Sequence, residues 1–296
     1  MTVAQTGIKE IKLENGTFCT VHTFMASSES FPPDSGTRQF DVILPPNYSQ
    51  KEKYPLIFMY DGQNLYRDYD SWNAPQTAAK LAVQKKIPPV VIVGLYHGGV
   101  FRRGEYFPQK AWSLVPKSLI AAAQPIVPGG CKSGIYLDWV VNTIRPYVIA
   151  NFPVTTEKQK TFIIGSSMGG LMSLNALIEY PDVFGGAACL STHWTGTQKP
   201  LPSAAPYLIQ WVKECIHDAS VTKQRIYFDH GDGDGNPGDL DFAYAPHQNE
   251  IDKIMASHGY SESAGNFKSL SFEHAIHHEK FWAERLPGAL EFLLAK

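Results

Sequence analysis

The chain has 296 residues, of which 44% are hydrophobic and 18% are charged, as in ordinary globular proteins. Its formal net charge is -2, with 26 basic and 28 acidic residues. This balance argues against a nucleic-acid-binding protein, which would carry a basic excess. A chain of this length buries enough surface to fold without a metal ion or a disulfide.

No stretch reaches the roughly 18 apolar residues that a membrane span requires. Residues 1–16 also lack the apolar core of a signal peptide. We therefore expect a cytoplasmic protein with no membrane partner, and a periplasmic or secreted location is the alternative if a signal peptide has been removed.

Four cysteines are spread too widely along the chain for a CxxC metal or redox pair. This spacing predicts reduced thiols, with one or two disulfides in a periplasmic or secreted protein as the alternative. The four are Cys19, Cys131, Cys189 and Cys215.

Two segments near the N-terminus, Phe18–Phe24 and Gln39–Leu44, alternate apolar with polar residues and predict strands of an antiparallel edge. Between them, residues 27–36 form a turn-rich stretch. Later runs are almost continuously apolar, which favours strands buried on both faces of a mainly parallel sheet. These runs are Leu56–Tyr60, Val90–Leu95, Thr161–Ile164, Ala187–Leu190, Arg225–Phe228 and Lys268–Phe272.

Apolar residues at three- and four-residue spacing predict helices in the intervals. The predicted helices are Ala74–Gln84, Tyr136–Ile149, Met168–Ile178, Tyr207–Ile216, Tyr244–Met255 and Phe281–Leu294. Alternation of strands and helices predicts an α/β fold, with helices on both faces of the sheet. We interpret residues 1–296 as a single domain whose N-terminal edge strands lie within residues 1–37.

The longest stretch without a clear pattern is 97–134, which we expect to be a loop or a lid-like excursion. Loops of this length are usually functional, so the stretch is predicted to border the active site, with a purely structural excursion as the alternative. It is basic, with Glu105 as its one acidic residue. The basic residues are Arg102, Arg103, Lys110, Lys117 and Lys132.

A glycine-rich turn, Gly165-Ser166-Ser167-Met168-Gly169-Gly170, lies between a predicted strand and a predicted helix. This is the pattern G-x-S-x-G in the context that an α/β-hydrolase nucleophile requires. Such a sharp turn strains the nucleophile's backbone, so its neighbours must be almost without side chains. The spacing selects Ser167 over Ser166. The helix N-terminus favours negative charge, and the backbone N–H of Met168 is the predicted first oxyanion donor.

A serine hydroxyl needs a base to take its proton, and in this fold class an acid and then a histidine follow the serine along the chain. His274, His277 and His278 lie between the last predicted strand and the last predicted helix, and spacing does not choose among them. The acid is expected after the strand Arg225–Phe228, where five aspartates compete. They are Asp229, Asp232, Asp234, Asp239 and Asp241.

Part of this aspartate-rich segment has the spacing of a calcium-binding loop. Asp232, Asp234 and Asn236 alternate as EF-hand ligands do. The match then fails, because Pro237 takes the glycine position and Ala243 takes that of the closing glutamate. We therefore expect no metal and no cofactor.

Several motifs resemble those of the putative esterase family, which includes esterase D, enterochelin esterases and feruloyl esterases. The resemblance runs from about Arg38 to the C-terminus. Its motifs are Asp61-Gly62-Gln63-Asn64-Leu65-Tyr66, similar to DGQNLF; Arg102 with Glu105-Tyr106 and Pro108, similar to R-x-x-E-Y-x-P; the GSSMGG turn at 165–170; and Leu190-Ser191-Thr192-His193-Trp194, similar to LSxxW. The resemblance implies an α/β-hydrolase fold and carboxylic-ester hydrolysis.

The resemblance also implies which histidine is the base. The family's histidine stands in the pattern H-x-E-x-x-W, which His277, Glu279 and Trp282 match. His277 is therefore chosen over the histidines on either side.

The triad acid implied by the resemblance is Asp241, because Leu240-Asp241 with Tyr244 matches the family's L-D-x-x-Y. Residues 233–238 look like an insertion before this motif. Asp234 and Asp239 therefore stay as alternatives.

The resemblance places the second oxyanion donor in the segment after the early strand, and we expect it to be the backbone N–H of Gln63. Asp61 and Asn64 are expected to hold this segment by side-chain hydrogen bonds. For the substrate pocket the candidates are Tyr66, Trp194 and Trp282, with core packing as the alternative for each.

The sequence thus predicts a serine carboxylic-ester hydrolase that acts through a Ser167–His277–Asp241 triad and an acyl-enzyme. Its partner is a small-molecule ester, with no nucleic acid and no membrane. The alternatives are an acyltransferase on the same fold, or a hydrolase of a specialised ester or thioester such as a feruloyl ester, a siderophore ester or S-formylglutathione.

Overall fold

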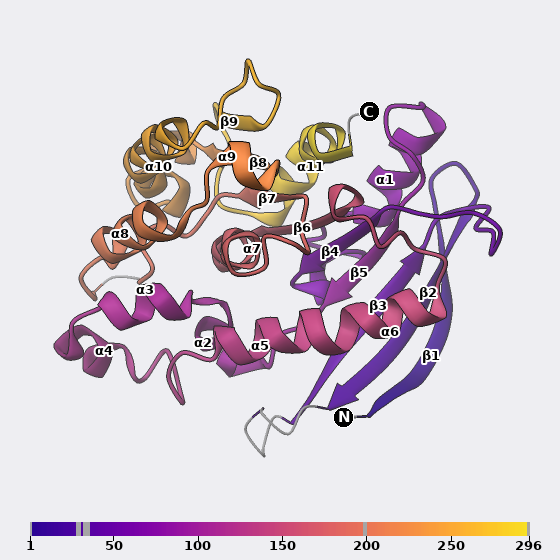
Figure 1. Ribbon diagram of the computed structural model, residues 1–296, viewed down its shortest axis with the longest axis horizontal. Helices are drawn as coiled ribbons and strands as arrows, with labels where there is room; N and C mark the ends of the chain where they lie inside the picture. The colour runs from indigo at the N-terminus through magenta and orange to yellow at the C-terminus, as the bar shows by residue number, and fades with distance from the viewer. Residues whose placement is uncertain (1, 28–30, 32–35, 198–199, 295–296) are drawn as a thin grey trace. The chain divides into compact units, whose positions relative to one another are not determined.

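The computed structural model describes residues 2–27, 31, 36–197 and 200–294 (Figure 1). Contacts divide the chain into two compact units. The first consists of residues 1–98, 135–163 and 278–296, and the second of residues 99–134 and 164–277. A single domain over the whole chain stays a prediction. Most of the turn expected at residues 27–36 lies outside the described residues.

The first unit carries the N-terminal part of the sheet, in the order β1-β2-β3-β5-β4. The long strands β1, β2 and β3 lie side by side in Figure 1. The pairs β1–β2, β2–β3 and β3–β5 are antiparallel, whereas the pair β4–β5 is parallel. The predicted antiparallel edge is therefore confirmed. The strands are β1 (Val3–Lys12), β2 (Phe18–Ser27), β3 (Thr37–Leu44), β4 (Leu56–Tyr60) and β5 (Val91–Leu95).

The strand β1 is not among the strands predicted from the sequence. No residue of this strand is buried, and eight of its ten residues are exposed. An edge strand of this kind has no apolar face, so its sequence lacks the alternation that marks a half-buried strand.

Helices of the first unit are α1 (Ala74–Val83), α5 (Ser133–Trp139), α6 (Arg145–Asn151) and α11 (Glu279–Leu294). The helix predicted as Tyr136–Ile149 is interrupted by a π-helical turn, Val140–Ile144. Pro146 follows this turn, and its ring nitrogen cannot donate to the carbonyl four residues earlier. The helical hydrogen bonds therefore change register just before the proline.

The strand β6 (Thr161–Ser166) begins in the first unit and ends in the second. In the second unit, β7 pairs in parallel with β8 and β8 with β9. The predicted parallel strands are thus confirmed there. These strands are β7 (Gly186–Leu190), β8 (Arg225–Gly231) and β9 (Phe267–Phe272). The helix before β7 is α7 (Met168–Glu179), and the helices between the three strands are α8 (Ala205–Cys215), α9 (Ala219–Thr222) and α10 (Leu240–Ser257).

The expectation of an irregular stretch at 97–134 was wrong. The segment contains the 3-10 turn Gly99–Phe101 and three short helices, which are α2 (Arg102–Tyr106), α3 (Gln109–Leu114) and α4 (Lys117–Ala123). Pro108 and Pro116 stand at the N-caps of α3 and α4. Helices of only five to seven residues span fewer than two turns, which is too short for a visible helical period.

All four cysteines lie in the described part of the chain, and all are free thiols. Cys19 and Cys189 are buried, and burial raises the pKa of the Cys19 thiol to about 12. Both behave as small apolar side chains. None of the helices in residues 2–27, 31, 36–197 and 200–294 combines the length and apolar character needed to cross a membrane.

A buried carboxylate joins three elements of the first unit. Asp41 on β3 is 0% exposed. It accepts hydrogen bonds from the hydroxyl of Tyr66, from the hydroxyl of Tyr96 at 2.8 Å and from the Gln39 amide at 3.1 Å. Burial, followed by the nearby Asp41 carboxylate, raises the pKa of both tyrosines, so both stay protonated as donors. Asp41 therefore ties the segment after β4 and the end of β5 to the sheet.

We expect Asp41→Ala to lower the free energy of unfolding by about 3 kcal/mol, because it leaves half-buried tyrosine hydroxyls without their charged acceptor. Asp41→Asn keeps one acceptor oxygen and should cost roughly half as much. Urea unfolding of the two variants and the unchanged protein measures both effects. Equal stability of Asp41→Ala and the unchanged chain would contradict this account.

Candidate active site

Ser167 stands in the sharp turn between β6 and α7, with backbone angles of φ 54° and ψ −121°. A positive φ is costly for a residue with a side chain and persists only where the surroundings impose it. Here the Ser167 N–H donates to the Leu190 carbonyl of β7 at 2.9 Å. A Cβ on Gly165 would lie 2.5 Å from the Gly169 carbonyl group, so only glycine allows this close turn, as the sequence predicts.

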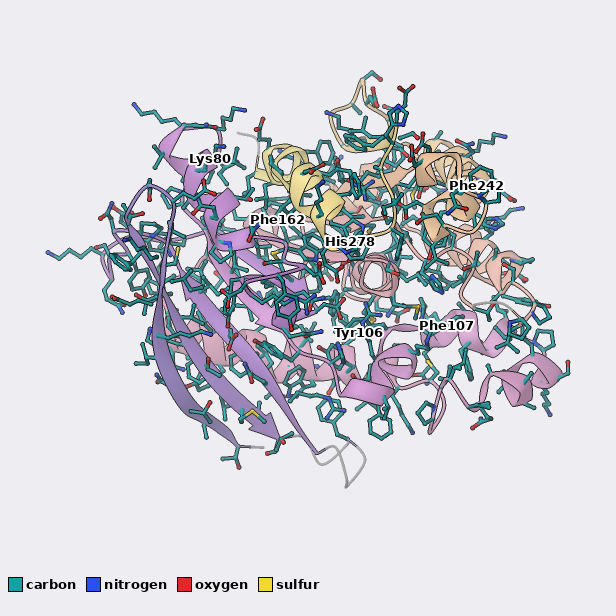
Figure 2. The ribbon with its side chains drawn as sticks, turned by 180° about the vertical axis from the view of Figure 1, so that it is seen from behind. Lys80, Tyr106, Phe107, Phe162, Phe242 and His278 are labelled. Atoms are coloured by element: carbon teal, nitrogen blue, oxygen red, sulfur yellow. The ribbon has the colours of Figure 1, made fainter. Side chains whose placement is uncertain are left out.

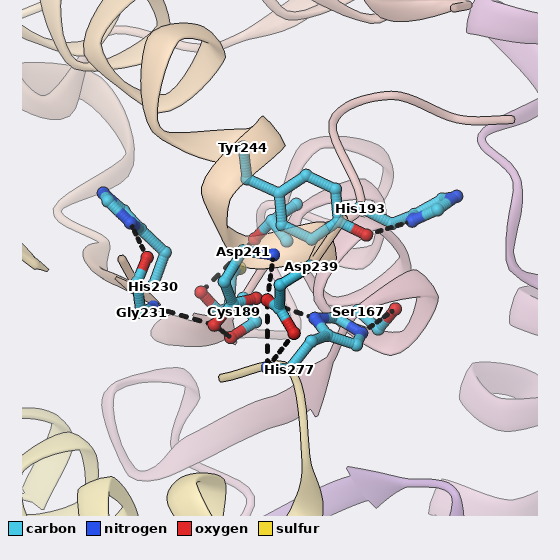
Figure 3. A network of polar contacts seen from close by, with 11 residues as sticks. Ser167, Cys189, His193, His230, Gly231, Asp239, Asp241, Tyr244 and His277 are labelled. Carbon is cyan, nitrogen blue, oxygen red and sulfur yellow. Dashed lines mark hydrogen bonds and ion pairs between the residues drawn. The ribbon is translucent and has the colours of Figure 1, made fainter. Parts of the chain in front are cut away.

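Three side chains of the second unit form a hydrogen-bonded line (Figure 3). The Nε2 atom of His277 lies 3.0 Å from Ser167 Oγ, and its Nδ1 atom lies 2.7 Å from Asp241 Oδ1. Asp241 is 0% exposed, whereas the His277 side chain keeps 12% of its surface open to solvent. The residues predicted as nucleophile, base and acid are thus within hydrogen-bonding distance of one another.

The second oxygen of Asp241 is held by two donors. Ser191 Oγ donates to Asp241 Oδ2 at 2.8 Å, and the backbone N–H of Gly231 donates to the same oxygen at 2.8 Å. A Cβ on Gly231 would lie 2.0 Å from the Ala275 carbonyl oxygen and 2.9 Å from Asp241 Oδ2. Glycine at the end of β8 therefore lets the acid and the histidine loop approach the strand.

Asp239 orients both partners of this pair. It is the N-cap residue of α10, and its side chain accepts from the backbone N–H of Asp241 at 2.8 Å. The backbone N–H of His277 also donates to the Asp239 carboxylate, at 3.3 Å. An N-cap carboxylate is a common way to satisfy free N–H groups of a helix. Here it fixes the start of α10 and the histidine loop together.

The alternative histidines and acid lie elsewhere. His274 Nδ1 pairs with Asp234 Oδ1 at 2.8 Å, and their side chains are 83% and 61% exposed. The Asp234 carboxylate raises the pKa of His274 through that hydrogen bond. His278 belongs to the first unit, where it lies 3.4 Å from Asp70. The exposed pair of His274 and Asp234 therefore has the features of a surface ion pair rather than of a catalytic pair.

A second histidine, which the sequence analysis did not single out as a site residue, lies beside the line. His193 Nδ1 shares a short hydrogen bond with the hydroxyl of Tyr244. The Tyr244 ring meets the rings of His193 and His277 edge-on, with centroids 5.6 Å and 5.5 Å apart. The Tyr244 hydroxyl also interacts with the Ser167 hydroxyl. Both residues fall in motifs that carried the family resemblance, which was the available signal.

Burial controls the protonation of this second pair. His193 is 1% exposed and Tyr244 is 0% exposed. Burial first, and then the positive charges of neighbouring side chains, hold the pKa of His193 well below its usual value. Burial likewise raises the pKa of Tyr244 well above its usual range. At neutral pH the pair is therefore uncharged, and His193 Nε2 has no hydrogen-bond partner among the described residues.

The two predicted oxyanion donors fall in different units. Met168 opens α7 directly after Ser167, and the first N–H groups of a helix have no acceptor within the helix. Gln63 lies in the 3-10 turn Gly62–Asn64 of the first unit, where its Nε2 atom is 2.7 Å from His97 Nε2. Both donor assignments stay predictions. Asn64 holds this segment as expected, since its amide donates to Glu279 Oε1 at 3.1 Å.

The predicted pocket residues have partners of their own. Trp194 is 0% exposed and donates from its indole N–H to Gln248 at 2.7 Å. Trp282 is 6% exposed and packs against Trp72 in the first unit, with centroids 5.9 Å apart. Burial of both tryptophans favours the packing role that the sequence left open. Tyr66 is half-buried and bonded to Asp41, and contact of these side chains with substrate stays a prediction.

No cluster of histidine, cysteine, aspartate or glutamate suited to a metal ion was found in the part of the chain that the structure describes. The segment with EF-hand-like spacing forms a 3-10 turn, in which the Asp232 side chain accepts from the backbone N–H of Asp234 at 2.8 Å. Asp234 Oδ1 pairs with His274 Nδ1 at 2.8 Å, and Asn236 Oδ1 accepts from the backbone N–H of Gly238 at 2.9 Å.

Comparison with known proteins gives related sequences and structures. The family model described as "Putative esterase" matches residues 35–293. An uncharacterized protein of Bacillus subtilis, YbbA, is 26% identical over 267 residues, which cover 88% of this chain and 94% of the relative. The siderophore triacetylfusarinine C esterase of Aspergillus fumigatus is 28% identical over 133 residues, which cover 44% of this chain and 41% of the relative. The structure of an IroE-like serine hydrolase from Shewanella oneidensis superposes with a TM-score of 0.67 at 16% identity, covering 93% of this chain and 80% of that one.

Proposed function

The chain belongs to the putative esterase family and is a carboxylic-ester hydrolase of the α/β-hydrolase fold, and from this premise we propose that it cleaves esters through Ser167 and a covalent acyl-enzyme. One observation carries the proposal. The distances of 3.0 Å from Ser167 Oγ to His277 and 2.7 Å from His277 to Asp241 give the three groups the order that general-base activation needs.

In the first step, Ser167 Oγ attacks the ester carbonyl carbon while His277 Nε2 takes the hydroxyl proton. Asp241 holds the Nδ1–H tautomer of His277 and stabilises the imidazolium that forms. Because Asp241 is fully buried, its charge acts on the imidazolium with little screening by solvent. His277 then protonates the leaving alkoxide, and the acyl group remains on Ser167.

The oxyanion of each tetrahedral intermediate needs donors that are already oriented. We assign this role to the backbone N–H groups of Met168 and Gln63. The position of Met168 at the start of α7 adds the partial positive charge of a helix N-terminus.

In the second step, water attacks the acyl-enzyme with His277 as base, and the acid product leaves. The 12% exposure of the His277 side chain supports access of water to this base. The Tyr244 hydroxyl, which interacts with Ser167 and with His193, is a positioning group for the serine in both steps.

The first test uses p-nitrophenyl esters from acetate to decanoate. We expect the unchanged protein to hydrolyse at least the short esters, and Ser167→Ala to lose more than about 10⁴-fold in kcat. Circular dichroism of the variant checks that the fold is kept. A Ser167→Ala protein that retains most of its activity would rule out this nucleophile.

The second test separates the competing acids with a matched pair of variants. Asp241→Asn should lower kcat by about 10⁴-fold, because an asparagine favours the wrong tautomer of His277. Asp234→Asn makes the same chemical change at an exposed aspartate bonded to His274, and it should leave kcat within about twofold. The reverse order of the two effects would assign the acid to Asp234.

A further inference from the structure

The helix α2 carries two adjacent arginines close to the nucleophile's helix. Both α2 and α7 belong to the second unit, and they pack against each other. Figure 2 labels Tyr106 and Phe107, which mark the end of α2. Tyr106 is 0% exposed and Phe107 is 3% exposed, so the C-terminal end of α2 is anchored in the core. The arginines in its first turn therefore stand on a fixed support.

The two arginines have different surroundings. The guanidinium of Arg102 lies over the ring of Tyr106, 5.1 Å from its centroid. Arg103 is half-buried. In the part of the chain that the structure describes, its guanidinium has neither a hydrogen bond nor an ion pair. Burial first, and then the charge of Arg102, lower the pKa of Arg103. An arginine that loses part of its hydration gains from a carboxylate or phosphate partner, because desolvation of its charge is costly otherwise.

The charge of Arg103 acts on two residues near the catalytic centre. It interacts electrostatically with Tyr244 and with His193. Tyr244 lies against the His277 ring and interacts with the Ser167 hydroxyl. The Asp239 carboxylate accepts from the backbone N–H groups of Asp241 and His277, and the Asp241 carboxylate is bonded to the His277 ring. The positive charge of Arg103 thus acts on the Tyr244–His193 pair, and neither Asp239 nor Asp241 forms an ion pair with it in the described part of the chain.

A second unsatisfied group lies in the same place. His193 is buried, and its Nε2 atom has no hydrogen-bond partner among the described residues. A buried polar atom without a partner is uncommon, and a catalytic role or a bound group is among the explanations for one. Arg103 interacts electrostatically with His193, so a charged donor and an unpaired ring nitrogen occur together around Tyr244, whose ring lies against His277.

We propose that Arg103 binds a carboxylate carried by the substrate, so that the preferred substrates of this enzyme are esters that bear a negative charge. This inference rests on the proposed function, because it assigns a substrate class to the same site. Guanidinium groups bind carboxylates through two parallel charge-assisted hydrogen bonds. In the substrate complex that carboxylate supplies the counter-ion that the protein does not provide.

The test compares esters that differ in one charge. On the acyl side, the mono-p-nitrophenyl ester of adipic acid is compared with p-nitrophenyl methyl adipate. On the alcohol side, 4-acetoxybenzoate is compared with its methyl ester. For each pair, kcat/KM is measured for the unchanged enzyme, for Arg103→Met and for Arg103→Lys. For each pair, the kcat/KM of the charged ester is divided by that of the neutral ester, and this ratio is compared between the variant and the unchanged enzyme. The comparison cancels the different intrinsic reactivity of the two esters.

We expect Arg103→Met to lower kcat/KM for at least one charged ester by about 30-fold, mostly through KM, and for its neutral partner by less than about twofold. Arg103→Lys should restore part of the loss, because it keeps the charge without the bidentate geometry. Lys117→Met, which removes one exposed charge from the same segment, is the control and should change both esters equally. The pair that responds shows on which side of the ester the carboxylate is bound.

Two outcomes would overturn the inference. If Arg103→Met changes the charged and the neutral ester of both pairs by the same factor, the residue has only a structural role. If Arg103→Met changes the kcat/KM of none of the four esters, Arg103 does not contact the substrate. Failure of the unchanged enzyme on all esters is a different result, because it removes the proposed function and the inference with it.

Discussion

The buried hydrogen bond between Asp241 and His277 is the interaction on which the rest of the site depends. Asp241 has no exposure to solvent, and its two oxygens are fixed by His277, Ser191 and Gly231. A buried carboxylate is tolerated only when its hydrogen-bonding capacity is filled. Those donors come from the ends of β7 and β8 and from the loop after β9. Filling the acid's hydrogen bonds therefore aligns three elements and points His277 at the nucleophile.

The strained turn at Ser167 is the complementary constraint. Its positive φ is held by a backbone hydrogen bond to Leu190, and the neighbouring Ser191 also has a positive φ, of 44°. Ser191 donates to Asp241, so the loop that supports the nucleophile also supports the acid. Strain at such a site is kept because the surrounding hydrogen bonds over-determine the backbone. The geometry of the serine and that of the acid are consequently not independent.

The sequence predicts well what depends on local pattern. Both ends of β4 were predicted correctly, because its five positions are all buried and apolar. The turn at Ser167 was predicted because only glycine fits at its neighbouring positions. The aspartates of the segment 229–241 were not separable by spacing, since the bonds of Asp239 and Asp241 to His277 join residues far apart in the chain. Arg103 likewise looks like one of several surface charges until its burial is known. Long-range contacts set these roles, and no local pattern records them.

The central claim is that Ser167 is an activated nucleophile, and covalent trapping tests it most directly. A fluorophosphonate probe phosphonylates a serine only where a base and an oxyanion site assist the attack. Peptide mapping by mass spectrometry should find a single stoichiometric adduct on Ser167 in the native protein, and none after His277→Ala or after denaturation. Hydrolytic activity that survives complete labelling, or an adduct on another serine that accompanies the loss of activity, would contradict the account.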